Sequence, residues 1–157
     1  MLNVQEELKL AYEDLGDNST LIYGTMSFFE YASFLFDKEN GDTILCRLHI
    51  GDVVSVNIEE GENFAIIRAI FCHKKNDLQF VFIIIDWFKE LNRKTLDCPV
   101  YRLRTTNNWR KIFSINLVNA INFAHFIHSC KDEECIGGDH NSENNLYIRN
   151  LYFFKAV

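Results

Sequence analysis

Apolar residues in the middle of the chain gather in three short runs that are separated by polar, turn-prone spacers. The runs are Val53–Ile58, Phe64–Cys72 and Leu78–Phe88, and all are rich in β-branched and aromatic residues. Such runs are typical of strands, so the pattern predicts a three-stranded meander. The third run contains FVFIIIDWF, which is apolar at both odd and even positions. We therefore expect Val81–Trp87 to be a central strand that is buried on both faces.

The N-terminal segment shows helical rather than strand periodicity. Its apolar residues recur three or four positions apart, at Val4, Leu8, Ala11, Tyr12 and Leu15. This spacing predicts an amphipathic helix over residues 3–15, and Gly16 is suited to end it. We expect residues 1–20 to form this helix and a lead-in, and residues 21–157 to form a single β domain.

Shorter apolar runs predict further strands on both sides of the meander. Asn40-Gly41 between Glu30–Asp37 and Thr43–Ile50 predicts a β-hairpin. Five more strands are expected at Leu21–Phe29, Val100–Arg104, Trp109–Ile115, Ala124–Cys130 and Leu146–Phe154. The polar residues 91–99 predict a connection, residues 131–145 a loop, and Leu117–Phe123 one helical turn. About ten strands with little helix predict a mainly β fold with a barrel-like core and short peripheral helices.

Composition and charge narrow the class of protein. With 157 residues, 48% of them hydrophobic and 14% aromatic, the chain can bury the core of one domain. No apolar run reaches the roughly 18 residues of a membrane-spanning helix, and MLNVQEELKL lacks the positive charge of a signal peptide. The net charge of −6 argues against direct nucleic-acid binding and favours a basic partner, or it serves only to keep the domain soluble.

The order of five sequence blocks resembles the BAH (bromo-adjacent homology) family. The blocks are FEYASFLFDKENGDTILCRLHIGDVVSV, FAIIRAIF, FIIIDWFKE, VNAINFAHFIHSC and NNLYIRNLYFF, which together cover roughly residues 28–155. The third is similar to the family's strand that ends in Trp-Phe or Trp-Tyr. The resemblance implies a distorted β-barrel and a chromatin module in the nucleus. Such modules bind histone tails or chromatin proteins, and some hold a methylated lysine in an aromatic cage.

The resemblance also implies candidate ligand-binding residues. The cage tryptophan of the family corresponds to Trp87, and the aromatic residue that opens the preceding strand corresponds to Phe64. Tyr31 could complete the cage, and Glu90 could attract a basic peptide. The family's second aromatic is replaced by Lys89, a cation that would repel a methylammonium group. Trp87 and Phe64 could instead be core or rim aromatics.

A cluster of cysteine and histidine residues suggests a zinc site. The pattern reads His125-x2-His128-x-Cys130-x4-Cys135-x4-His140. Thiolates and imidazoles are the usual zinc ligands, and structural sites use four of them. Cys130, Cys135, His140 and His128 are the favoured set, because His128 and Cys130 share one strand face. The alternatives are a polar loop with free thiols or a cysteine pair, and we expect no other cofactor.

Motifs of catalysis are missing from the sequence, so we expect a protein that is not an enzyme. There is no glycine-rich phosphate loop, no Gly-x-Ser-x-Gly and no His-Glu-x-x-His. Asp86, the acidic residue within the apolar third run, is expected to pair with Arg68 on the neighbouring strand. A basic patch of Arg102, Arg104, Arg110 and Lys111 could contact phosphate or form a salt-bridged surface.

Two functional hypotheses follow from these patterns. The first is a chromatin-associated module that binds a histone tail or a chromatin protein, and Trp87 beside Phe64 favours it. The second is a protein-interaction or structural domain without a methyl-lysine cage, held together by zinc or not. It would belong to a multi-domain nuclear or mobile-element protein, and Lys89 favours it.

Overall fold

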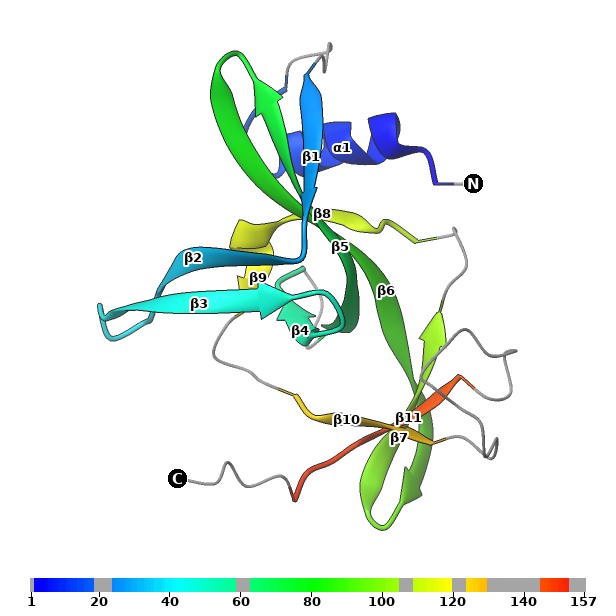
Figure 1. The fold of residues 1–157 in the computed structure, drawn as a ribbon. Helices are drawn as coiled ribbons and strands as arrows, with labels where there is room; N and C mark the ends of the chain where they lie inside the picture. The colour runs from blue at the N-terminus through cyan, green and yellow to red at the C-terminus, as the bar shows by residue number, and fades with distance from the viewer. Residues whose placement is uncertain are drawn as a thin grey trace.

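A computed structural model describes residues 2–18, 24–58, 63–104, 109–119, 124–129 and 145–152. These residues contain one α-helix, one short 3-10 helix (η1) and eleven strands (Figure 1). The helical elements are α1 (Val4–Glu13) and η1 (Ile115–Leu117). The strands are β1 (Thr25–Phe29), β2 (Tyr31–Asp37), β3 (Thr43–His49), β4 (Val53–Val56), β5 (Asn63–Lys75), β6 (Leu78–Thr95), β7 (Cys98–Arg104), β8 (Ile112–Ser114), β9 (Val118–Asn119), β10 (Phe126–Ser129) and β11 (Leu146–Arg149).

The prediction of a mainly β fold is confirmed. Nine of the described strands form one antiparallel sheet in the order β10-β11-β7-β6-β5-β4-β9, with β1 beside β5 and β8 beside β6. Strands β2 and β3 form a separate two-stranded sheet, seen as a projecting hairpin in Figure 1. No closed barrel is found among the described strands, because this order ends at β10 on one side and at β9 on the other. The finer likeness to a distorted barrel stays a prediction.

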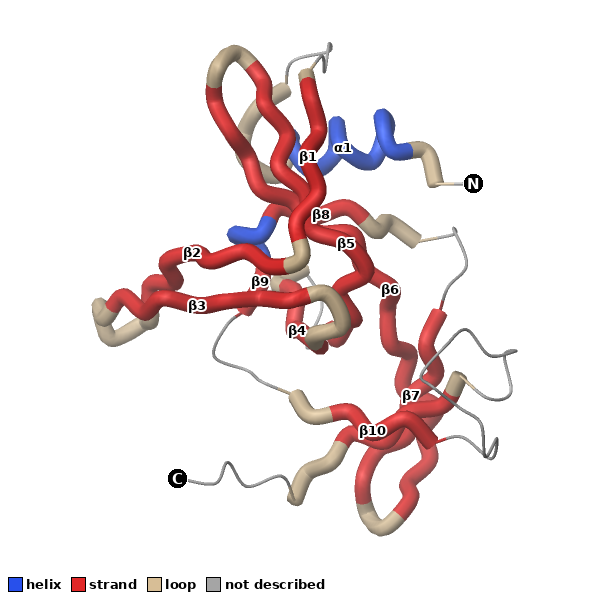
Figure 2. Tube along the Cα trace, in the orientation of Figure 1, coloured by secondary structure: helices blue, strands red, loops and turns tan. Residues whose placement is uncertain are grey.

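The two longest strands change partners along their length, which leaves the sheet open. Strand β5 pairs with β4 over Asn63–Ile66 and with β1 over Ile70–Lys74. Strand β6 pairs with β8 over Phe82–Ile84 and with β7 over Trp87–Thr95. Each half of the long β5–β6 hairpin therefore has its own flanking strands. Figure 2 shows these two groups of strands diverging toward opposite ends of the molecule.

The connection predicted over residues 91–99 is wrong. Strand β6 runs to Thr95, and β7 begins at Cys98 after a two-residue turn. Leu96 and Asp97 have φ values of 50° and 60°, a pair of positive angles typical of a type I′ hairpin turn. Leucine is rare in this conformation, which is why the sequence does not signal the turn.

Other expected elements are confirmed with shorter bounds. The helix begins after Asn3, whose side chain accepts a hydrogen bond from the Glu6 N–H, and Gly16 follows it with a φ of +82°. Within the region Trp109–Ile115, only Ile112–Ser114 is a strand. Of the helical turn expected over Leu117–Phe123, only Leu117 is helical, as the last residue of η1, and Val118–Asn119 is a strand. Residues 120–123 lie outside the described residues. Within the described part of the C-terminal segment, β11 ends at Arg149 rather than continuing through Tyr152.

Burial organises the sheet around three apolar clusters. On one face of β6, Ile83 and Ile85 belong to the central cluster, and on the other face Phe82 belongs to a second cluster. All three are 0% exposed, so the two-sided burial predicted for β6 is confirmed at its centre. The second cluster lies under α1, and a third joins β5, β6 and β7 to β10 and β11. Each fully buried side chain of this size stabilises the fold by about 1.5–3 kcal/mol. Among the described helices, none is long and apolar enough to cross a membrane.

Helix α1 packs across one end of the β5–β6 hairpin. Its residues Leu8, Ala11 and Tyr12 are buried against Phe71 and Phe82 of the sheet. This end lies at the top of Figure 1, with β1 beside it. The opposite end of β6, near β7, has no helix over it among the described residues.

Gly24 marks a close approach of two backbones at the start of β1. A Cβ atom at this position would lie 2.0 Å from the Lys74 carbonyl oxygen and 2.7 Å from Nε2 of His73. Any side chain would therefore push β1 away from β5, so only glycine fits here.

Candidate functional site

Three of the four residues predicted to bind a ligand line one pocket at the β7 end of β6. The pocket has a volume of about 230 Å³, and Phe64, Trp87 and Glu90 contribute to its wall. The remaining lining residues are Asn63, Phe88, Lys89, Tyr101, Arg104 and Trp109. Tyr31 lies elsewhere, on β2, where the Arg47 guanidinium is 5.1 Å from the centre of its ring.

The rings of Trp87 and Phe64 belong to opposite faces of the sheet. Ala65 pairs with Trp87 across β5 and β6, which places Phe64 opposite Phe88. Because neighbouring side chains of a strand alternate between faces, Trp87 and Phe64 diverge. Trp87 joins the central cluster, whereas Phe64 joins the cluster shared with β7, β10 and β11. The two rings reach the pocket from different sides and do not form adjacent walls of one cage.

Both rings also have their own partners within the chain. Trp87 is 6% exposed, donates a hydrogen bond from Nε1 to the Arg110 carbonyl oxygen at 2.7 Å, and meets Phe113 edge-on. Phe64 is 2% exposed, and the Arg149 guanidinium lies 4.4 Å from its ring centre. A methylammonium ligand needs open aromatic faces, and the burial of both rings leaves little of either face open.

A row of cationic side chains crosses the β6–β7 hairpin beside the pocket. Lys89 pairs directly with Arg102, and Trp87 pairs with Arg104, so all four side chains are on one face. Within the described part of the chain, no carboxylate forms an ion pair with Lys89, Arg102 or Arg104. Like charges directly opposite each other destabilise a sheet. We call Lys89, Arg102 and Arg104 the cationic row.

An exposed tryptophan adjoins the cationic row. Trp109 is 50% exposed, and the Arg104 guanidinium lies 5.1 Å from its ring centre. The ring thus combines a large contact area with a polar edge, in the way that interface tryptophans do. From the sequence, Trp109 was expected only as part of a strand. The sequence signal available for the cationic row was the alternate spacing of Arg102 and Arg104 in one predicted strand, with Lys89 just after the end of the preceding apolar run.

The basic patch predicted from the sequence is divided by the structure into two parts. Arg110 forms an ion pair with Asp14 at the end of α1, and Lys111 forms one with Asp86 at 2.7 Å. Arg110 thus joins the end of α1 to the segment before β8, and Lys111 joins that segment to β6. Arg102 and Arg104 lie apart from them, in the cationic row. Ion pairs therefore account for half of the patch, and the one that Lys111 forms is buried rather than at the surface.

Asp86 is held by two cations inside the sheet. The predicted pair with Arg68 is confirmed at 2.8 Å, and the Lys111 ammonium contacts the second carboxylate oxygen at 2.7 Å. The side chains of Asp86 and Lys111 are each 9% exposed. A buried carboxylate needs such partners, and both of its oxygens are used. This arrangement gives Asp86 a structural role.

A second buried polar group was not anticipated from the sequence. The Tyr12 hydroxyl of α1 lies 2.6 Å from Nδ1 of His73 on β5. Burial, followed by the nearby Lys75 ammonium, lowers the pKa of His73 below its ordinary value of 6.5. Burial and the charge of Asp17 raise the pKa of Tyr12 to about 12. The imidazole and the hydroxyl therefore both stay neutral, and the hydrogen bond between them fastens α1 to the sheet.

The predicted zinc ligands lie mostly outside the described residues. Cys130, Cys135 and His140 are not described, so the zinc prediction stays a prediction. His128 is on β10, and its ring stacks on Tyr147 with centroids 4.8 Å apart. Within the described ranges, no group of three or more metal-ligating side chains occurs.

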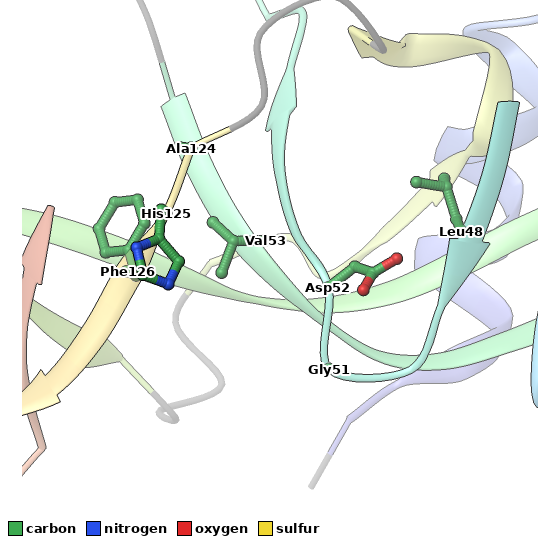
Figure 3. A pocket seen from close by; sticks show the side chains of 7 residues that line it. All are labelled: Leu48, Gly51, Asp52, Val53, Ala124, His125 and Phe126. Carbon is green, nitrogen blue, oxygen red and sulfur yellow. The ribbon is translucent and has the colours of Figure 1, made fainter. Parts of the chain in front are cut away.

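A second pocket lies between the turn that joins β3 to β4 and the segment that leads into β10. Its volume is about 320 Å³, and Figure 3 shows His125 and Asp52 on opposite sides of it. The Asp52 carboxylate accepts a hydrogen bond from the His49 N–H at 2.8 Å, and Nδ1 of His125 is 3.3 Å from the Asn150 amide. Both polar groups have partners within the chain, and the pocket contains none of the predicted ligand-binding residues.

Comparison with known proteins finds no matching family model, no matching curated protein and no matching solved structure. What the chain binds is therefore inferred from its own residues.

Proposed function

We propose that this chain is a non-catalytic binding module that holds an acidic segment of a protein partner on its β6–β7 hairpin. The observation that supports the proposal is the cationic row, which has no carboxylate partner among the described residues and adjoins the exposed Trp109. A carboxylate-bearing partner would relieve the repulsion between Lys89 and Arg102. It would also gain the paired hydrogen bonds that an arginine offers to a carboxylate.

The neighbouring pocket gives the partner an apolar contact. Its volume of about 230 Å³ suits one side chain rather than a drug-sized molecule. Trp109 and Tyr101 line it, and tryptophan, tyrosine and arginine are the residues that most often dominate binding energy at interfaces. We therefore expect the partner segment to combine acidic residues with one apolar residue.

This proposal takes the second of the two hypotheses drawn from the sequence, an interaction domain without a methyl-lysine cage. The resemblance to the BAH family supports a chromatin protein as the partner and the nucleus as the location. The ion pairs around Asp86 support a protein that is not an enzyme, because the most buried carboxylate of the sheet has both oxygens occupied.

A histone-tail reader remains the second candidate function, and two observations favour it. Phe64, Trp87 and Glu90 all line the pocket, and the chain carries a net charge of −6 that would attract a basic tail. Against it stand the burial of both rings and the cations beside them.

Glu90 separates the two candidates, because it is exposed and lines the same pocket as Lys89 and Arg104, although it pairs with Tyr101 on the opposite face of the hairpin. The wild-type chain and Glu90→Lys would be titrated by calorimetry with two peptides, one rich in Asp and Glu and one of Lys- and Arg-rich histone-tail composition, methylated and unmethylated. If the proposal is right, the acidic peptide binds the wild-type chain and binds Glu90→Lys more tightly. A histone reader would instead bind the basic peptide and lose affinity in this variant.

The location of the site is tested by charge reversal with a matched control. Arg102→Glu should weaken binding of the acidic peptide by about tenfold or more, and the effect should shrink at high salt. Lys74→Glu makes the same change in net charge at an exposed position on β5, far along the hairpin, and should change the affinity little. Equal losses in both variants, or binding of single-stranded RNA in preference to either peptide, would contradict the proposal.

A further inference from the structure

The β2–β3 hairpin presents an uncovered face away from the body of the molecule. It forms its own two-stranded sheet and projects sideways in Figure 1. One face, with Ala32, Phe34 and Leu48, packs on the central cluster. On the other face, Leu35 and Leu45 form a cross-strand pair and are 71% and 70% exposed. Two large apolar side chains side by side on a projecting ribbon are a feature of interaction surfaces.

Unmatched charges flank this apolar pair on both sides. Toward the body, Ser33 pairs with Arg47, and toward the tip, Asp37 pairs with Thr43. The Arg47 guanidinium lies over the Tyr31 ring, and the Asp37 carboxylate accepts a hydrogen bond from the Thr43 hydroxyl at 2.6 Å. Neither charge has an oppositely charged partner among the described residues. From the base of the hairpin to its tip, this face thus carries a cation (Arg47), then the apolar Leu35–Leu45 pair, then an anion (Asp37).

A face with this order is complementary to itself. If a second ribbon is turned end over end about an axis through the Leu35–Leu45 row, its tip lies over the base of the first. The apolar rows then meet, and Arg47 lies within reach of the carboxylate that sits one row beyond the leucines. The same pairing is repeated by symmetry, as a two-fold interface requires.

We propose that the β2–β3 face binds a second copy of this chain, ribbon against ribbon and with the strands antiparallel. Leu35 and Leu45 of each copy form the apolar centre. Arg47 of one copy pairs with Asp37 of the other on both sides of it. An unrelated partner would match this order of cation, apolar pair and anion only by chance, whereas a second copy of the chain has the same order in reverse.

The size of the ribbon indicates a weak dimer. Seven residue pairs span about 24 Å, which is short for an interface. Its buried area falls below the roughly 1,200 Å² at which stable complexes begin. We therefore expect association in the micromolar range or weaker, visible only as concentration rises. The dimer would leave both cationic rows open, so a partner with repeated acidic segments would gain from two-site binding.

Charge exchange provides the test, using the full chain in sedimentation equilibrium from micromolar to millimolar concentration. Arg47→Asp and Asp37→Arg should each raise the dissociation constant by about tenfold, because each sets like charges against one another. The double variant Arg47→Asp/Asp37→Arg restores opposite charges and should recover dimerisation. Leu45→Glu should abolish it. Circular dichroism of each variant checks that the fold is kept.

A chain that stays monomeric throughout this range would overturn the proposal. So would a dimer whose affinity ignores the single charge reversals, or one that the double variant fails to restore. The titrations with acidic peptide at low chain concentration test the β6–β7 site separately, since the dimer does not form there.

Discussion

The two ends of β6 differ in whether nearby cationic side chains have carboxylate partners among the described residues. At the α1 end, Lys75 pairs with Asp17 at 2.5 Å and Arg110 pairs with Asp14, so each cation meets a carboxylate from the helix or the loop after it. At the β7 end, Lys89 faces another cation across the hairpin. The contrast separates an end whose cations are paired within the chain from an end whose cations have no carboxylate partner among the described residues.

Helix α1 accounts for the matched end. The Glu7 carboxylate accepts hydrogen bonds from the backbone N–H groups of Lys111 and Ile112, at 2.6 and 2.8 Å. The polar groups that α1 brings to the sheet are thus used to fix the helix in place. No described element does the same for the cationic row, and stability alone gives no reason for three unmatched cations there.

The largest expected loss of stability comes from removing the buried carboxylate of Asp86, whose side chain is 9% exposed. Asp86→Ala removes the carboxylate that Arg68 and Lys111 both contact, and the Lys111 side chain is itself 9% exposed. Removing one partner of a buried ion pair in this way should lower the free energy of unfolding by about 3 kcal/mol or more. Urea unfolding followed by circular dichroism measures the change. A loss below about 1 kcal/mol, typical of surface pairs, would contradict the view that this ion pair is buried and structural.

Acid should weaken the matched end through His73. Its pKa is lowered in the folded state, so the unfolded chain binds the proton more readily. The free energy of unfolding should therefore fall as pH drops below 6.5, by up to about 1.4 kcal/mol per pH unit, until the folded pKa is reached. Denaturant melts between pH 7.5 and 5 test this. His73→Gln should flatten the slope, and a profile that the variant shares with the wild type would exclude His73 as its source.

The smallest expected effect has the opposite sign and concerns the cationic row. Arg102→Gln removes one of two like charges that face each other, so it should raise the free energy of unfolding by up to about 0.5 kcal/mol. Arg110→Gln, the matched change at an arginine that has a carboxylate partner, should lower it. Thermal melts of both variants at low salt make the comparison. Destabilisation by Arg102→Gln would mean that the row serves the fold rather than a partner.

Local signals made the helix, the first hairpin and the central strand predictable. Asn40-Gly41 specifies a tight turn, and the apolar run of β6 specifies burial, because both act over a few neighbouring residues. The Arg68–Asp86 pair was predictable for a related reason, since a buried carboxylate on one strand needs a cation on the next.

Register and partner exchange were not predictable in the same way. Whether Phe64 shares a face with Trp87 depends on how β5 is aligned with β6. No local sequence signal in either strand specifies that alignment. The open sheet likewise follows from strands that change partners along their length. The Leu96–Asp97 turn was missed because tertiary pairing of β6 with β7 imposes an unusual backbone on a leucine.

The length of β6 determines the order in which parts of the molecule open. Its middle, around Ile83, is bonded to strands on both sides, whereas Lys94 and Thr95 pair with β7 alone among the described strands. Backbone amides should therefore exchange with solvent quickly at the hairpin tip and slowly at the centre, in a gradient along one strand. If the proposed partner binds there, the end that carries the cationic row can open and re-form around it many times while the α1 end stays folded.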